Sequence, residues 1–319
     1  LITIKKALSE LISRGMLYSR VGKGTFVAEA PNKIDFSKHL TIAYILKDLD
    51  NPFYQSIVKS VERNLSKNNC NLMLFSSDSK KDREERKIKD FVNMGVSGLI
   101  IGSMSHIHYT TSLIKQLRRE LFPFVMVSHT EDPDICFIGT DQIEGGFMAT
   151  EHLIKCGYSK IGYINGEKGN MVGNARKHGY TKAMEKHGLV VQEKFTLRMK
   201  VHRNRSDFQS GFELGKEFIN LSEKPEAIFV YNDLTALGLM RSLKENGVRV
   251  PEDLALVGFD DIHQGEISAV PLTTIHQPAD RIGNLVVKKL IKKISGDNSI
   301  SRHLLKPELV IRESCGTHN

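Results

Sequence analysis

The stretch AIFVYNDLTALGLMRSLKENGVRVPEDLALVGFDD, residues 227–261, decides the fold of this chain. It opens with the apolar run Ala227–Tyr231 and closes with a second apolar run, Leu254–Phe259. Between the two runs, apolar residues such as Leu237 and Met240 keep a helical period. Uninterrupted apolar strands joined by a helix are typical of a parallel sheet that is covered on both faces. The stretch therefore predicts a β-α-β unit.

Polar side chains follow both strands of this unit at their carboxyl ends. Asn232 and Asp233 come after the first strand, and Asp260 and Asp261 come after the second. Open α/β sheets bind ligands at this edge, so these amide and carboxylate groups are candidates for a binding site. Asp233 has another interpretation, because Asp at this position caps the helix that follows. Asn232 and Asp260 are therefore the better ligand candidates.

The same alternation of strand and helix patterns runs through residues 40–127. The expected strands cover residues 41–46, 71–75, 98–101 and 124–127, and the expected helices cover residues 52–67, 81–94 and 109–119. Repeated βαβ units of this kind imply parallel sheets with right-handed crossovers. The fold class is therefore α/β, with doubly wound parallel sheets.

Length and composition agree with a large α/β protein. A chain of 319 residues with 40% apolar content buries a large core and predicts two or three domains. No stretch approaches membrane-spanning length, and the opening LITIKKALSE lacks the apolar segment and cleavage site of an export signal. The spacing of the four cysteines does not match a metal site, and scattered cysteines of this kind are typical of a protein in a reducing compartment. The four are Cys70, Cys136, Cys156 and Cys315. We therefore expect a cytoplasmic protein without membrane association.

About half of the net positive charge lies at the start of the chain. The formal net charge is +8, and segment 1–27 contains five basic residues but a single acidic residue, Glu10. These basic residues are Lys5, Lys6, Arg14, Arg20 and Lys23. Such a local basic surface is typical of proteins that bind an acidic polymer. The alternative is a solvated basic face on a small capping subdomain, because charge runs alone are common.

The first residues also show a defined order of elements. Ile4, Leu8 and Leu11 keep a helical period, and two short strand patterns then flank a glycine turn at residues 21–24. A helix followed by a basic hairpin is half of a winged helix. The segment TIKKALSELISRGMLYSRVGKGTFVA, residues 3–28, closely resembles the recognition helix and wing of GntR-type bacterial regulators.

In the GntR family the helix enters the major groove of DNA and the wing approaches the minor groove. The resemblance therefore implies DNA contacts through Thr3, Lys5, Lys6, Arg20, Lys23 and Gly24. Lys and Arg attract phosphates, and glycine lets the backbone come close. The family has an Arg where Leu1 stands and two further helices before it, so we expect residues 1–27 to be a partial winged-helix domain. Residues 28–39 read as a linker.

The remaining chain carries a second resemblance. Residues 136–165, CFIGTDQIEGGFMATEHLIKCGYSKIGYIN, resemble the effector-binding domain of the LacI/GalR family, and NARKHGY at 174–180 and LTTIHQPADRIG at 272–283 follow in the family order. The resemblance covers nearly all of residues 40–315. It implies a two-lobed fold similar to that of periplasmic sugar-binding proteins. The implied lobes are residues 40–157 with 278–300 and residues 158–276 with 304–315, and the implied chain crossings lie near residues 157–160, 275–278 and 301–305.

The LacI/GalR resemblance implies an effector in the cleft between the lobes. The residues implied to bind it are Phe53, Tyr54, Asp141, Arg176, Asn232, Asp260 and Gln277. His129, after the predicted strand 124–127, is a further candidate. A buried sugar requires a partner for each hydroxyl group, and carboxylates, arginine and amides supply acceptors and donors together.

Several of these candidates have purely structural alternatives. Phe53 and Tyr54 have the default role of aromatic core residues, and His129 has that of a solvated loop residue. Asp141 has the alternative role of capping the helix that follows it, and Arg176 that of a residue on a solvated helix face.

A GntR-type head on a LacI-type sensor is similar to the family of bacterial arabinose-responsive repressors. That resemblance implies a dimeric repressor of operator DNA whose effector is L-arabinose or a related sugar. Effector binding then closes the lobes and changes the spacing of the two heads in the dimer. The alternatives are a sensor that no longer binds DNA and a sugar-binding protein of a transport system.

Other function classes lack their motifs. Residues 211–216 are one residue short of a phosphate loop and lie on a helical pattern. His106 and His108 have no third ligand nearby, and a zinc site requires three or four. We therefore expect no enzymatic activity, no cofactor and no metal site.

Overall fold

The computed structural model describes residues 2–13, 16–20, 22–27, 39–78, 80–102, 111–127, 130, 132–200 and 207–316. The chain divides into two compact units, Leu1–Leu40 and Thr41–Asn319. Within the second unit, parallel sheets are covered by helices on both faces, so the predicted α/β class is confirmed. In the described part of the chain, no helix combines the length and the apolar character needed to cross a membrane.

The first unit consists of a helix and a β-hairpin. Helix α1 (Ile2–Ser13) is followed by an antiparallel pair, β1 (Leu17–Arg20) and β2 (Gly24–Val27). Gly22 and Gly24 have φ angles of 76° and 107°, which only glycine adopts without strain, and they let the hairpin turn. The Tyr18 and Phe26 rings stack across the hairpin with centroids 5.6 Å apart.

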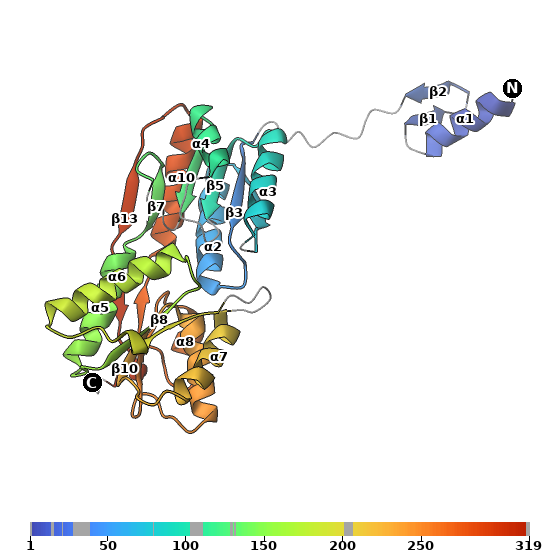
Figure 1. The fold of residues 1–319 in the computed structure, drawn as a ribbon. Helices are drawn as coiled ribbons and strands as arrows, with labels where there is room; N and C mark the ends of the chain where they lie inside the picture. The colour runs from blue at the N-terminus through green and yellow to red at the C-terminus, as the bar shows by residue number, and fades with distance from the viewer. Residues whose placement is uncertain are drawn as a thin grey trace. The chain divides into compact units, whose positions relative to one another are not determined.

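The first lobe of the second unit is built on a six-stranded parallel sheet, in the order β13-β7-β6-β5-β3-β4 (Figure 1). Its strands are β3 (Thr41–Leu46), β4 (Asn71–Ser76), β5 (Gly98–Gly102), β6 (Phe124–Val127), β7 (Phe137–Thr140) and β13 (Arg302–Leu305). Its helices are α2 (Pro52–Ser66), α3 (Lys81–Asn93), α4 (Ser112–Arg119) and α10 (Ala279–Ile294). Helices α2 and α10 cover one face of the sheet, and α3 and α4 cover the other.

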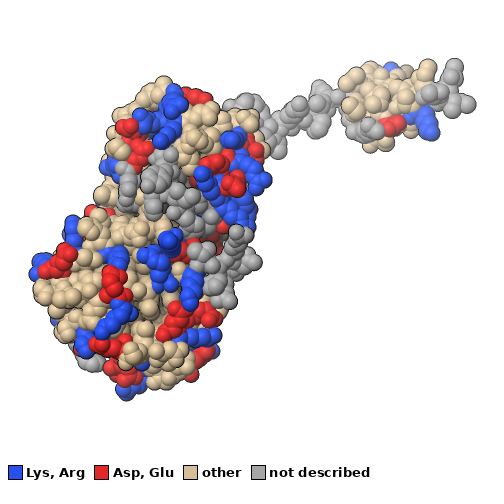
Figure 2. All heavy atoms as spheres, viewed as in Figure 1, with Lys and Arg blue, Asp and Glu red and all other residues tan. Residues whose placement is uncertain are grey.

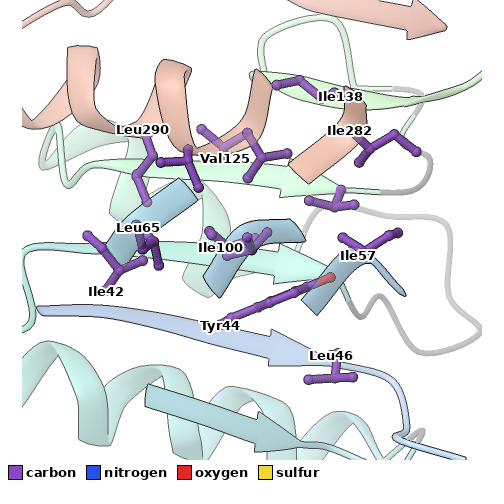
Figure 3. Packing of buried hydrophobic residues seen from close by; sticks show 14 of the residues in the cluster. Ile42, Tyr44, Leu46, Ile57, Leu65, Ile100, Val125, Ile138, Ile282 and Leu290 are labelled. Atoms are coloured by element: carbon purple, nitrogen blue, oxygen red, sulfur yellow. The ribbon is translucent and has the colours of Figure 1, made fainter. Parts of the chain in front are cut away.

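Successive residues of each first-lobe strand point to opposite faces, so both faces are apolar. Ile42 and Tyr44 of β3 pack with Ile57 of α2 and Leu290 of α10 (Figure 3). Ala43, the residue between them, belongs to the cluster on the α3 and α4 side. Burial on both sides explains why the strands are continuous apolar runs rather than alternating ones.

The second lobe is built on a four-stranded parallel sheet in the order β11-β10-β8-β9. Its strands are β8 (Ile161–Asn165), β9 (Thr196–Arg198), β10 (Ala227–Val230) and β11 (Ala255–Val257). Its longer helices are α5 (Gln142–Lys155), α6 (Met171–Lys186), α7 (Asp207–Ile219) and α8 (Asp233–Glu245). Short elements complete it: η2 (Glu193–Phe195), α9 (His263–Glu266), η3 (Glu313–Cys315) and the antiparallel pair β12 (Thr274–His276) with β14 (Glu308–Val310).

The stretch 227–261 forms the β-α-β unit that its sequence predicts, with β10 and β11 parallel and α8 between them. The second strand is shorter than expected. It ends at Val257, and the chain then turns sharply at Asp260 and Asp261, whose φ angles are 127° and 57°.

The chain passes between the two lobes three times. The first passage follows Thr140, the last residue of β7. The second follows Gln277, and the third follows Leu305, the last residue of β13. The first passage differs from the expected position near residues 157–160. Helix α5 packs on α6 of the second lobe so closely that a Cβ on Gly146 would lie 2.2 Å from the Arg176 carbonyl oxygen.

The third passage also differs from the expectation. We expected it near residues 301–305, but residues 302–305 form β13, which is hydrogen-bonded to β7 in the first-lobe sheet (Figure 1). The chain then enters the second lobe and pairs β14 with β12.

Two buried tyrosines give a test of the packing. The Tyr180 hydroxyl donates to the Ile161 carbonyl at 2.8 Å, whereas the Tyr44 hydroxyl has no hydrogen-bond partner among the described residues. Replacing Tyr180 by Phe leaves a buried carbonyl unpaired and should lower the free energy of unfolding by about 1–2 kcal/mol. Tyr44→Phe should leave it unchanged or raise it. Urea denaturation of both variants measures the contrast, and equal losses would contradict it.

Candidate functional site

A pocket lies where the carboxyl ends of the two sheets meet the chain passages. The first lobe lines it with Asn51, Phe53, Tyr54, Ile57, Val127, Gly139 and Ile282. The second lobe lines it with Val172, Arg176, Tyr231, Asn232 and Asp260, and residues near the passages add Thr140, Gln142 and Gln277. The lining combines an aromatic wall with buried charged and amide groups, the usual composition of a small-molecule site.

Arg176 lies at the centre of the polar side of this pocket. Its side chain is buried, so the alternative of a solvated helix face is wrong. Its Nε donates to Oε1 of Gln142 at 2.8 Å, and its Nη1 donates to the Tyr231 carbonyl. Its Nη2 lies 3.6 Å from Oδ1 of Asp260, and the guanidinium carbon lies 3.5 Å from the centre of the Phe259 ring. These contacts fix the guanidinium plane in one orientation.

Asp260 is the carboxylate that faces Arg176. Its Oδ1 accepts from Nε2 of Gln277 at 2.7 Å, and the side chain of Asn51 also hydrogen-bonds to it. Burial raises the pKa of Asp260 to about 7, against the opposing effect of Arg176. Because Asn51 belongs to the first lobe and Arg176 to the second, Asp260 contacts groups from both lobes.

The amide of Asn232 serves two structural contacts beside the pocket. Its Oδ1 accepts from the Thr235 backbone N–H at 2.9 Å and caps α8, while its Nδ2 donates to Oδ2 of Asp207 at 2.6 Å. The capping role expected for Asp233 therefore belongs to Asn232. Asp233 is fully buried and accepts from the Thr274 hydroxyl at 2.6 Å and from the Ile262 N–H at 3.0 Å.

Asp141 is also placed as a helix cap. Its Oδ1 accepts from the backbone N–H groups of Ile143 and Glu144 at 3.1 and 3.0 Å, at the start of α5. It is not among the described residues that line the pocket. The structure therefore favours the capping alternative for Asp141. His129 lies outside the described residues.

Phe53 and Tyr54 open helix α2 and form the aromatic wall. Their ring centroids are 5.5 Å apart, and Asn51 caps the helix by accepting from the Phe53 N–H at 2.9 Å. Phe53 also belongs to the buried cluster of the first lobe, so the core role and the pocket role are combined in one ring. Burial raises the pKa of the Tyr54 hydroxyl, which therefore stays protonated near neutral pH.

Sequence reasoning missed four polar contributors to the pocket: Asn51, Thr140, Gln142 and Tyr231. Gln142 accepts from Arg176 and donates to Oε1 of Gln277 at 3.2 Å, and it follows Asp141 at the end of β7. The strand-end rule that selected Asn232 therefore applied to Gln142 as well. Tyr231 and Thr140 carried no such signal, because both belong to strand patterns.

The first unit holds the second group of candidates. Lys5 and Lys6 are exposed on α1, Arg20 ends β1, and Lys23 and Gly24 lie at the hairpin turn. The guanidinium of Arg20 lies over the Tyr18 ring, 5.5 Å from its centre. The side chain of Thr3 lies outside the described residues.

The raised pKa of Asp260 gives a pH test. A carboxyl whose pKa is about 7 when folded and about 3.9 when unfolded contributes stability that is complete below pH ~4 and lost as the pH rises through 7. The Asp260→Asn variant does not show this loss of stability, because asparagine does not titrate. The unfolding free energy of the variant minus that of the wild type should therefore rise between pH ~4 and pH ~8, on the order of 2–4 kcal/mol. Urea denaturation across this range measures it, and a constant difference would refute the assignment.

Comparison with known proteins agrees with this architecture. Residues 150–315 match the family model described as periplasmic binding protein-like domain. The chain is 30% identical over 278 residues to the HTH-type transcriptional repressor PurR of Haemophilus influenzae (strain PittEE), covering 86% of this chain and 81% of the relative. It is 29% identical over 328 residues to the arabinose metabolism transcriptional repressor of Halalkalibacterium halodurans, covering 98% and 86%.

A solved structure gives the same result. A regulatory protein of the LacI family from Chloroflexus aggregans superposes with a TM-score of 0.74 at 28% identity, covering 87% of this chain and 99% of that one. None of these three proteins is named as an enzyme. The chain thus belongs to the family of periplasmic-binding-protein-like effector domains found in LacI-type transcriptional regulators.

Proposed function

We propose that this protein is a sugar-responsive transcriptional repressor whose effector binds in the pocket around Arg176 and Asp260. The observation that carries the proposal is the buried set formed by Arg176, Asp260 and Gln277, which lies where both lobes and the chain passages meet. A ligand held by this set contacts both lobes at once. Its binding energy therefore depends on their relative position.

The chemistry of the lining suits a sugar. Asp260 accepts hydrogen bonds, Arg176 donates them in a fixed fork, and the amides of Asn51 and Gln277 do both. Each sugar hydroxyl is both donor and acceptor, so a mixed set satisfies it where a purely acidic or basic one does not. Phe53 supplies an aromatic face for the C–H side of a sugar ring.

Relatives name several sugars. The ribose operon repressor of Escherichia coli (strain K12) is 30% identical over 276 residues, and the structure of a regulator CelR in complex with cellobiose has a TM-score of 0.76. The arabinose relative matches 98% of this chain, whereas the PurR and ribose relatives match 86%. The longer match includes the first unit. For this reason we propose L-arabinose or a related sugar as the effector.

The proposed regulation follows from the three passages. Effector closes the two lobes of each subunit, and in a homodimer this closure changes the spacing of the two heads. The change in DNA affinity is no larger than the effector's difference in affinity between the open and closed states.

The proposed DNA-binding head lies in the first unit and consists of a GntR-type recognition helix and wing within residues 1–27. Its exposed Lys5 and Lys6 lie on α1, the proposed recognition helix, and Arg20 and Lys23 flank the proposed wing. Gly24 has a positive φ that glycine adopts without strain, and its lack of a side chain lets the backbone come close to DNA. On the face shown in Figure 2, the basic residues of the second unit are interspersed with acidic ones, which favours the first unit as the DNA contact.

Calorimetric titration tests the effector site. The panel is L-arabinose, D-ribose, D-glucose, cellobiose and a purine base. We expect one sugar to bind, and Arg176→Lys to weaken its binding by about 2 kcal/mol, since a lysine lacks the bidentate fork. Asp141→Asn is the matched control, because asparagine still caps α5 and the side chain lies outside the pocket lining. Binding of the base alone, or of nothing in the panel, would refute the sugar assignment.

Selection of binding sequences from a random DNA duplex pool tests the head. Lys23→Ala should weaken binding to the selected duplex and lower the slope of log K against log salt by about 0.9, because one phosphate contact is lost. The matched control is Lys244→Ala, an exposed lysine on α8 of the second unit, which should change neither quantity. Failure to select any duplex, with sugar binding intact, would favour a sensor that does not bind DNA.

A further inference from the structure

Two consecutive residues beside the pocket adopt a backbone conformation that L-amino acids rarely take. Asp260 has a φ of 127° and Asp261 a φ of 57°, and neither is glycine. Such conformations persist only where surrounding contacts hold them, and they gather at functional sites. The contacts that hold this turn are therefore part of how Asp260 reaches the pocket.

Asp261 is held from two directions, outside the pocket. Its Oδ1 accepts from Nη2 of Arg312 at 2.7 Å, and its Oδ2 lies 2.9 Å from Nδ1 of His276. Arg312 is itself fixed, since its Nη1 donates to the Leu272 carbonyl at 2.9 Å. The Asp261 and Arg312 side chains are 17% and 16% exposed, so water screens this pair only in part.

The turn and the second chain passage form two matched contacts. His276 holds Asp261, and the next residue, Gln277, donates to Oδ1 of Asp260 at 2.7 Å. A backbone contact adds to these two: the Asp260 N–H donates to the Ile275 carbonyl at 2.9 Å. The side chains of neighbouring residues thus point to opposite sides, one into the pocket and one away from it. Any rotation of the turn at Asp261 moves the Asp260 carboxylate.

We propose that Asp261, anchored by Arg312 and His276, is a positioning residue that aims the Asp260 carboxylate at the bound effector. This inference rests on the proposed function of the pocket. Asp261 itself touches no effector, and it acts by holding the strained turn. The same contacts connect the turn to two of the chain passages. His276 precedes the second passage, and Arg312 follows the third.

The anchor predicts a particular pH dependence of effector binding. His276 faces Asp261 on the turn, Glu308 on β14 and Arg312 beyond β14. The hydrogen bond that His276 donates to the Asp261 carboxylate raises the pKa of His276, so the imidazolium holds Asp261 more strongly than the neutral ring does. As the pH rises through this pKa the anchor weakens. Asp260 titrates in the opposite sense for binding, since its ionised form is the better acceptor.

Asp261→Asn tests the anchor itself. Asparagine tolerates the left-handed conformation and keeps the side-chain size, so the variant loses only the charge that Arg312 and His276 contact. We expect it to weaken binding of the sugar identified in the panel by about tenfold, within the range seen for directly coupled contacts. Thermal unfolding of the variant confirms that it is folded.

His276→Gln tests the pH dependence and also serves if Asp261→Asn fails to fold, since the His276 side chain is 41% exposed. The ratio of variant to wild-type affinity at each pH cancels the titration of Asp260. We expect the variant to bind several-fold more weakly at pH ~5.5 and nearly equally at pH ~8.5, above the range of histidine titration. The matched control is His263→Gln, whose ring also faces a carboxylate, Glu266 at 3.2 Å, but on the exposed α9. Its ratio should stay at one throughout.

The outcomes separate the two proposals. A wild-type protein that binds no sugar refutes the proposed function. A wild-type protein that binds sugar, while Asp261→Asn and His276→Gln match its affinity at every pH, overturns the positioning role and leaves the function intact.

Discussion

The contact between Arg176 and Asp260 is the constraint on which the rest of the site depends. Each of these two side chains is only 4% exposed, and an isolated buried charge costs several kcal/mol. Burial of the guanidinium therefore requires partners that balance its charge and accept from its donors. Gln142, the Tyr231 carbonyl and Asp260 are those partners, and the Phe259 ring covers the guanidinium plane. The polar side of the pocket therefore consists largely of groups that contact the buried guanidinium of Arg176.

Those partners come from separate parts of the chain, and this explains the position of the passages. Gln142 begins α5 directly after the first passage, and Gln277 stands at the second. Asn51, which also hydrogen-bonds to Asp260, belongs to the first lobe. A single hydrogen-bonded set therefore joins both lobes beside the segments at which the chain passes between them. In the proposed function, a ligand whose hydroxyl groups hydrogen-bond to members of this set changes the contacts between the two lobes.

Much of the fold follows from local sequence pattern, and the site follows only in part. Continuous apolar runs predicted four of the six first-lobe strands, β3, β4, β5 and β6, to within one residue, because burial on both faces leaves a strong signal, whereas β7 and β13 were not predicted. The assignment of α5 to the wrong lobe has a physical cause. An amphipathic helix such as Gln142–Lys155 shows which side is buried but not which sheet it covers, since that depends on contacts such as Gly146 against Arg176.

The capping residues show the limit of reasoning from residue type. Asn or Asp follows a strand at Asp141, Asn232 and Asp260, among other places, and the sequence signal is the same in these three. Asp141 is occupied by backbone N–H groups alone, Asn232 divides its amide between a cap and Asp207, and Asp260 faces the pocket. The difference lies in the backbone. A helix begins directly after Asp141 and Asn232 and offers N–H groups to their side chains, whereas the left-handed turn at Asp260 and Asp261 delays the next helix to His263. With no helix start to cap, the carboxylate of Asp260 faces Gln277 and Arg176 in the pocket lining. The turn at Asp260 and Asp261 is therefore the structural reason that the Asp260 carboxylate lines the pocket and does not cap a helix.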